Sequence, residues 1–200
     1  MIKFEEVSKN YYDKKILEKI NIDINSGEFV LLVGDNGTGK STLLKLLSHA
    51  IYPSCKKVIK NEMFNAYLPE KFSLPKTLTV KEFVDFLESY FVKNLYDYLT
   101  YLDIPNKRIG SLSKGNLQKL GLLTVIASNN NTILLDEPCE GMDESLKKKF
   151  IEILKKLKNS KTIIISTHSP SFYKTFKPRI LYFKDGNIYE KNSHTSKNIW

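Results

Sequence analysis

The sequence predicts an α/β fold with a mostly parallel core sheet. Three runs are apolar almost throughout, as strands buried on both faces should be. Segments with the apolar spacing of helices lie between these runs, and parallel strands need such crossover helices. The three runs are "FVLLV" at 29–33, "TILLDE" at 132–137, which ends in two acids, and "TIIIST" at 162–167.

The first third of the chain predicts strands followed by a helix. An alternating strand at 21–24, "NIDI", is separated from the 29–33 strand by the turn "NSGE". A glycine-rich turn then leads into "KSTLLKLLSHA", which has helical spacing and begins at Lys40. Weak alternation over 53–68 predicts short strands.

The remaining two thirds predict three helical stretches and a hairpin. Residues 79–102 and 115–128 are helical by apolar spacing, and 144–161 is an amphipathic helix. The stretch "RILYFKDGNIYEK" predicts two strands that turn at Asp185 and Gly186. We expect one domain over 1–200, without internal repeats or low-complexity linkers.

Composition favours an ordinary globular domain of the cytosol. Of its 200 residues, 42% are hydrophobic and 26% charged. Its apolar runs are too short to span a bilayer, and the N-terminus lacks the layout of a signal peptide. Cys55 and Cys139 lie far apart without further ligands at metal-binding spacing, which predicts reduced, mainly structural thiols.

The net charge of +9 is concentrated near the C-terminus. Residues 147–200 carry 13 Lys and Arg against 3 Asp and Glu. Such asymmetry can attract nucleic acid or acidic lipid. Many of these lysines, however, belong to the helix at 144–161, so we interpret them as its solvated face and expect no nucleic-acid partner. The predicted inner face consists of Leu146, Phe150, Ile153, Leu154 and Leu157.

Residues 34–41, "GDNGTGKS", match the P-loop pattern between a buried strand and a helix. Glycines let backbone N–H groups face phosphates, and the helix N-terminus adds its positive dipole end. We expect Lys40 to contact the β- and γ-phosphates and Ser41 to hold Mg²⁺. Nucleoside triphosphate binding is therefore predicted, although this motif alone does not name the reaction. The predicted cradle consists of Asn36, Gly37, Thr38, Gly39, Lys40, Ser41 and Thr42.

Three further polar residues follow buried strands. Asp136 and Glu137 follow the predicted strand 132–135, and His168 follows the strand near 162–167. The carboxyl ends of parallel strands meet at one edge, so these side chains should lie beside the P-loop. Asp136 fits a Mg²⁺ ligand, directly or through water, and Glu137 fits a base or water-positioning group. His168 could contact the γ-phosphate.

The order of these motifs resembles the nucleotide-binding domain of ABC transporters over nearly the whole chain. "LSKGN" resembles the ABC signature, "EGMD" the D-loop and "STHS" the H-loop. The resemblance implies head-to-tail dimers in which Ser113 and Gly115 address the γ-phosphate on the other subunit. It also implies that Tyr11, with Tyr12 as the alternative, stacks on adenine and that Asp143 lies along the interface.

The chain departs from the family pattern at three points. The signature has Lys114 in place of a glycine and Asn116 in place of a glutamine. Glu70 stands where the family has the Q-loop glutamine, and it could still coordinate Mg²⁺. The segments between Lys40, Glu70 and the signature are short, which predicts a small antiparallel β region and a shortened helical subdomain at about 72–128.

The resemblance implies an ATPase that binds ATP and Mg²⁺. It would form a homodimer or pair with another ABC subunit, and it would power a separate multi-span membrane protein from the cytoplasmic face of the cell membrane. The "LSKG" form favours an exporter.

Two other classes of protein are weaker alternatives. A soluble ABC ATPase acting on ribosomes or chromosomes would be expected to carry a second cassette or a coiled-coil insertion. This sequence has one set of the motifs and no heptad insertion. A GTPase should carry Asn-Lys-x-Asp, whereas "NKRI" has Ile109 at the last position.

Overall fold

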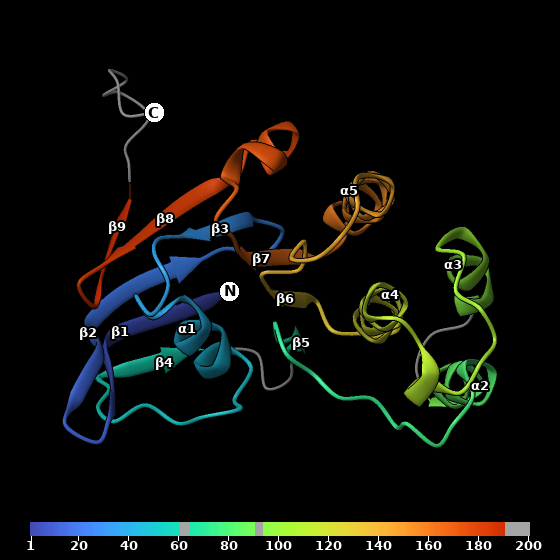
Figure 1. Cartoon of the computed structure of the whole chain (residues 1–200). Coiled ribbons are helices and arrows are strands. Elements are labelled where there is room, and N and C mark those ends of the chain that lie inside the picture. Colours follow the sequence, from blue (N-terminus) through green and yellow to red (C-terminus); the bar gives the residue numbers. More distant parts are fainter. Residues whose placement is uncertain (61–64, 91–93, 191–200) are drawn as a thin grey trace.

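The computed structural model describes residues 1–60, 65–90 and 94–190 (Figure 1). Within them the main sheet has six strands in the order β5-β6-β7-β3-β8-β9. All neighbours are parallel except β8 and β9. The predicted α/β fold with a mostly parallel core sheet is confirmed. The strands are β3 (Phe29–Val33), β5 (Ala66–Leu68), β6 (Thr132–Asp136), β7 (Thr162–Ser166), β8 (Arg179–Lys184) and β9 (Asn187–Glu190).

A second, antiparallel sheet has the order β2-β1-β4. It consists of β1 (Ile2–Tyr11), β2 (Lys14–Ile24) and β4 (Val58–Lys60). The sequence pattern predicts the end of β2, and β4 lies within the short strands predicted over 53–68, but β1 is missed. The pairing of β1 with β2 shifts register between Phe4 and Val7, and Glu6 lies between them with φ of 49°. This bulge breaks the alternation that would have marked β1 as a strand.

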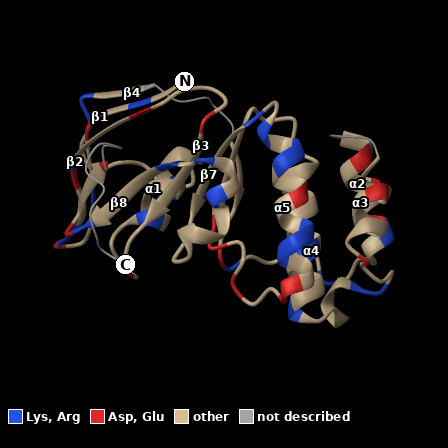
Figure 2. Ribbon diagram, turned by 90° about the horizontal axis from the view of Figure 1, so that it is seen from above, with Lys and Arg blue, Asp and Glu red and all other residues tan. Residues whose placement is uncertain are grey.

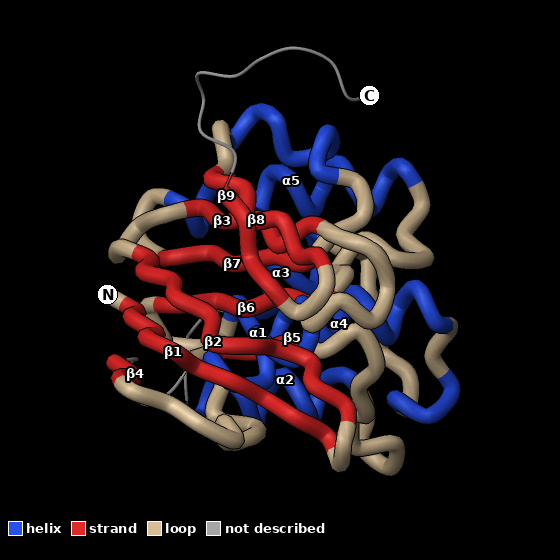
Figure 3. Tube along the Cα trace, turned by 90° about the vertical axis from the view of Figure 1, so that its left-hand side faces the viewer, coloured by secondary structure: helices blue, strands red, loops and turns tan. Residues whose placement is uncertain are grey.

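The main sheet is buried on both faces. Leu31 belongs to the core on the side of α4 and α5, whereas its neighbour Leu32 belongs to the core shared with α1 and the antiparallel sheet. Figure 1 shows α1 (Lys40–Leu47) on one side and α4 (Lys114–Ile126) with α5 (Glu144–Lys158) on the other. Figure 3 shows β3, β7 and β6 running side by side.

The stretch 79–102 is helical over most of its described residues, as predicted, but it contains two helices. The structure has α2 (Val80–Tyr90) and α3 (Leu95–Tyr101), and residues 91–93 lie outside the described part of the chain. Asn94 has φ of 72°, a left-handed conformation that ends regular helix geometry. Figures 1 and 2 show α2 and α3 on the side of the molecule away from the antiparallel sheet. Two 3₁₀ helices, η1 (Ile109–Ser111) and η2 (Pro170–Phe176), precede α4 and β8.

The amphipathic helix and the hairpin are confirmed. α5 buries Leu146, Phe150, Ile153 and Leu154, and Leu157 is half-buried. Figure 2 shows lysines along this helix, and Lys148, Lys155 and Lys156 are exposed. Asp185 and Gly186 have φ of 49° and 75°, the left-handed pair that a tight hairpin turn requires.

Two expectations concern properties of the whole chain. Both cysteines are free: Cys55 is exposed, and Cys139 is half-buried. None of the helices in the described ranges has both the length and the apolar character needed to cross a bilayer.

Candidate nucleotide site

The loop between β3 and α1 can be built only with glycine at two positions. Gly39 has φ of 109°, and a Cβ there would lie 2.7 Å from the Leu17 side chain. At Gly34, with φ of 155°, a Cβ would lie 2.5 Å from the carbonyl oxygen of Phe183. The loop therefore packs its backbone closely against β2 and β8, which fixes how its N–H groups are presented.

Lys40 begins α1 and places a cation inside this loop. Its side chain is buried, and Nζ donates to the carbonyl oxygens of Gly34 at 2.6 Å and Asp35 at 2.9 Å. Burial lowers the pKa of this ammonium group. A cation next to a helix N-terminus is the arrangement that proteins use to bind phosphate.

Asp136 ends β6 and is buried beneath three hydroxyl groups. Its Oδ1 accepts from Ser41 Oγ at 3.1 Å and from Ser166 Oγ at 2.6 Å. Its Oδ2 accepts from the Tyr67 hydroxyl at 3.3 Å, and burial raises the pKa of that phenol. A serine hydroxyl beside a carboxylate is a hard oxygen donor set, which fits Mg²⁺.

Glu137 adopts a left-handed backbone conformation with φ of 45°. Its N–H donates to Ser166 Oγ at 2.9 Å. Its Oε1 lies 3.0 Å from His168 Nε2, which is close enough for an ion pair if the imidazole is protonated. The two groups are not oriented for a hydrogen bond. Burial raises the pKa of this carboxyl, while the charges of His168 and Lys40 oppose that rise.

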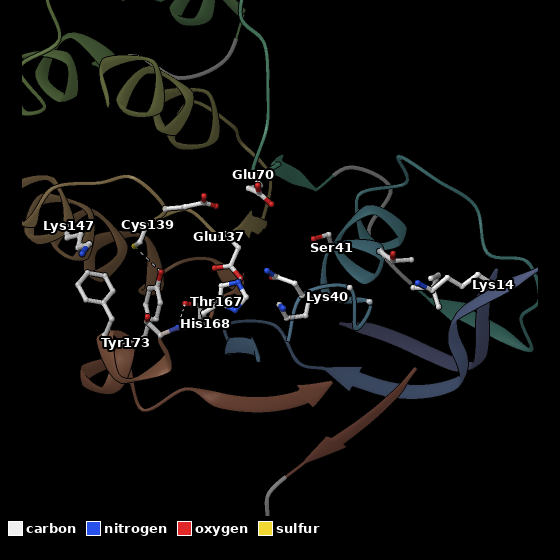
Figure 4. Close-up of a pocket in the computed structure, with 18 residues that line it drawn as sticks. Lys14, Lys40, Ser41, Glu70, Glu137, Cys139, Lys147, Thr167, His168 and Tyr173 are labelled. Atoms are coloured by element: carbon white, nitrogen blue, oxygen red, sulfur yellow. Dashed lines mark hydrogen bonds and ion pairs between the residues drawn. The ribbon is translucent and has the colours of Figure 1, made fainter. Parts of the chain in front are cut away.

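One cavity of about 820 Å³ is lined by Gly39, Lys40, Ser41, Glu137 and His168, among others (Figure 4). In Figure 4, Lys40, Glu137 and His168 lie together at its centre, Lys14 lies at one end, and Cys139 and Tyr173 lie at the other. The volume is that of a pocket for a small organic ligand. The predicted site residues among those lining it are Asn36, Gly37, Gly39, Lys40, Ser41, Thr42, Glu70, Glu137 and His168.

Other predicted residues are not part of the cavity lining. Thr38 donates through Oγ1 to the carbonyl oxygen of Asp35 at 2.8 Å. Asp136 is hydrogen-bonded to Ser41, which lines the cavity, but does not line the cavity itself. Tyr11 is 39% exposed, and the Lys9 ammonium lies 5.1 Å from its ring centroid. Tyr12 occupies the β1–β2 turn and is fully exposed.

Ser113 and Gly115 also lie outside the lining of this cavity. Ser113 caps α4 by accepting from the Asn116 N–H at 3.2 Å. A Cβ added at Gly115 would meet no atom within 4 Å. Lys114 reaches back toward Gly141, where its Nζ would lie 3.7 Å from an added Cβ. Asp143 caps α5 by accepting from the Leu146 N–H at 2.7 Å.

Several lining or contacting residues are not among the predicted site residues. Lys14 and Ile16 of β2 line the cavity because β2 passes beside the glycine loop. Tyr67 and Ser166 reach Asp136 from the two strands adjacent to β6. Cys139 lines the cavity, and its Sγ lies 3.2 Å from the Tyr173 hydroxyl. Burial raises the pKa of the Cys139 thiol to about 11. The contacts of Tyr67 and Ser166 depend on which strands pair with β6, and the order of strands in a sheet is not written in a local sequence pattern. The one available signal is that Ser166 lies two residues before His168.

Comparison with known proteins identifies the family. A family model described as "ABC transporter" matches residues 17–140. The phosphonates import ATP-binding protein PhnC of Fusobacterium nucleatum subsp. nucleatum is 30% identical, over 98% of this chain and 95% of its own length. MJ1023 of Methanocaldococcus jannaschii, described as an uncharacterized ABC transporter ATP-binding protein, is 33% identical over 92% of this chain and 74% of its own.

A solved structure agrees with these relatives. The dimeric structure of MJ0796, described as a bacterial ABC transporter cassette, superposes with a TM-score of 0.81 at 26% identity, covering 94% of this chain and 96% of that one. The matched model, the relatives and the cavity built on the glycine loop agree, and this chain belongs to the ABC transporter family as an ATP-binding ATPase subunit.

Proposed function

We propose that this chain is the ATP-hydrolysing subunit of an ABC transporter that pairs head to tail with a second ABC subunit and powers a separate membrane protein. The observation that carries this proposal is an asymmetry. Lys40, Ser41, Glu137 and His168 converge on one cavity, whereas the signature serine, Ser113, stands outside it.

The glycine loop and Lys40 would hold the triphosphate. Backbone N–H groups of the loop and the Lys40 ammonium bind the phosphate oxygens, and Ser41 with Asp136 would hold Mg²⁺. Glu70, an exposed residue of the cavity lining, would provide a further oxygen ligand. When bound, the metal ion neutralises charge on the phosphates.

Glu137 would position the attacking water and accept its proton. Its raised pKa brings the carboxyl closer to neutral pH, where a general base accepts a proton more effectively. His168, 3.0 Å from Glu137 Oε1, orients this carboxylate and can donate to the γ-phosphate. Positioning and electrostatic stabilisation provide most of the catalysis in this class of reaction.

Ser113 and Gly115 would complete the cavity of a second subunit. They begin α4, so a hydroxyl and backbone N–H groups are presented at a positive helix end, as in the glycine loop. Asp143 would lie along the same interface, and Tyr11 would stack on adenine once the nucleotide is bound.

We propose export as the direction of transport, because the signature reads "LSKG"; the Fusobacterium relative is named for import. The subunit would work at the cytoplasmic face. With the membrane partner in vesicles that carry this subunit outside, ATP should drive cargo from the outer solution into the lumen. Movement of cargo out of the lumen would contradict export.

The proposal is tested by replacing the carboxylate while keeping its shape. Glu137→Gln should still bind ATP but lose hydrolysis by about 100-fold or more, because the base is gone. It should accumulate as a dimer with ATP and Mg²⁺, measured by gel filtration with light scattering. Glu144→Gln removes an exposed acid of α5 and serves as the control. A Glu137→Gln chain that hydrolyses ATP normally would contradict the assignment.

A further inference from the structure

We propose that Ser166 is a positioning residue that holds Asp136 and Glu137 in their working arrangement. Ser166 is the last residue of β7, is completely buried, and lies directly opposite Asp136 in the β6–β7 register. It is the first residue of the "STHS" segment, two positions before His168, but it does not line the cavity and has no predicted role in binding or catalysis. The inference rests on the roles proposed above for the two acids.

A single hydroxyl connects both acids. Ser166 Oγ donates to Asp136 Oδ1 at 2.6 Å and accepts from the Glu137 N–H at 2.9 Å. A serine hydroxyl has one donor and two acceptor positions, so it can make both bonds at once. The bond to Asp136 is shorter than those from Ser41 and Tyr67, at 3.1 and 3.3 Å, as expected for a well-formed bond to a carboxylate.

The bond to the backbone of Glu137 bears on catalysis. Glu137 has φ of 45°, a conformation that residues other than glycine rarely adopt. In this conformation the chain turns out of β6, and the carboxylate lies 3.0 Å from His168 Nε2 at the cavity. Ser166 fixes the N–H at the point of this turn. Without that bond the backbone can return toward extended geometry, which would move the carboxylate away from His168.

β7 provides a matched control at its opposite end. Thr162 is also buried, and its Oγ1 accepts from the Gly27 N–H at 2.9 Å. Thr162→Ala therefore removes a buried hydroxyl from the same strand without touching either acid. Loss of stability alone should affect both alanine variants, whereas loss of positioning should affect only Ser166→Ala.

Steady-state ATP hydrolysis by the full chain gives the first test. Ser166→Ala should lower kcat by about 10- to 100-fold, the effect typical of residues that orient metal-binding groups, and should change the KM for ATP less than kcat. Thr162→Ala should retain kcat. Equal kcat values in the two variants would overturn the proposal.

Hydrogen exchange at the Glu137 amide gives a second test that needs neither turnover nor a membrane partner. This amide should exchange slowly in the wild type, faster in Ser166→Ala, and unchanged in Thr162→Ala. If the alanine variant does not fold, Ser166→Cys keeps the volume with a weak donor and should show the same direction. Exchange that is insensitive to Ser166 would overturn the proposal, even if Glu137 proves not to be the base.

Discussion

The N-termini of α1 and α4 differ in their surroundings. Each of these helices begins within a glycine-containing motif, α1 in the glycine loop and α4 in the signature. α1 starts after Gly39 without a side-chain cap, and Lys40, Glu137 and His168 share its cavity. α4 is capped by its own Ser113 and stands outside that cavity. At the α1 end a cation, a carboxylate and a histidine line the same cavity, whereas Ser113 and Gly115 at the α4 end do not line it. An α4 end outside the cavity of its own chain is what the proposed shared site requires.

The largest expected effect comes from removing the cation of the α1 site. Lys40→Met should weaken ATP binding by the isolated chain about 100-fold or more, because charge-assisted hydrogen bonds contribute about 1.5–3 kcal/mol each. Lys45→Met, on the same helix, is the matched control. Calorimetric titration with ATP and Mg²⁺ measures both. Wild-type affinity in Lys40→Met would remove the basis for calling the α1 end a phosphate site.

A charge at the α4 end should separate binding from hydrolysis. Gly115→Asp fits the folded chain, since an added Cβ meets no atom within 4 Å, and an acid suits the first turn of a helix. ATP affinity of the isolated chain should stay unchanged. Hydrolysis and ATP-dependent pairing should fall by about tenfold or more, because like charges across an interface repel by several kcal/mol.

Gly115→Asn is the control for size without charge, and it should have a milder effect. Reduced ATP affinity in the isolated Gly115→Asp chain would mean that α4 serves the cavity of its own subunit.

The raised pKa of Glu137 predicts two pH effects. As pH falls, hydrolysis should begin to decline at a higher pH than an ordinary glutamate would give, because the base becomes protonated earlier. Burial disfavours the ionised Glu137 carboxyl in the folded chain. The folded state therefore loses stability relative to the unfolded state as pH rises through the raised pKa. Glu137→Gln should therefore unfold at a higher temperature than wild type near neutral pH, with the gain vanishing in acid.

Thermal unfolding across pH, with Glu144→Gln as the control, measures this effect. A Glu137→Gln chain less stable than wild type at neutral pH would mean that the charges of Lys40 and His168 outweigh burial.

The smallest effect is expected at Glu70, which is exposed at the rim of the α1 cavity. Glu70→Ala should lower partner-stimulated hydrolysis by about two- to fivefold, the range expected for one exposed charge, with less change in ATP affinity. Stimulation equal to wild type would leave Glu70 without a role in coupling to the membrane partner.

The sequence predicted the parts of the site that depend on short segments. The glycine loop, Asp136, Glu137 and His168 each follow an apolar strand, and parallel strands bring their carboxyl ends to one edge. Ser166 and Tyr67 could not be assigned in this way, because their contacts depend on register between strands far apart in the sequence. The strand β1 was missed for a related reason, since its bulge at Glu6 breaks the local pattern.

Intermolecular cross-linking tests the central claim most directly. Two differently tagged chains would share one background, with Glu137→Gln, Cys55→Ser and Cys139→Ser. One chain would also carry Asp35→Cys in the glycine loop, and the other would carry Asn116→Cys in the signature helix. With ATP and Mg²⁺, a short bifunctional thiol reagent should join the glycine loop of one chain to the signature helix of the other. The product should contain both tags and require ATP. Cross-links mainly between identical chains, or equal yield without ATP, would contradict the head-to-tail site.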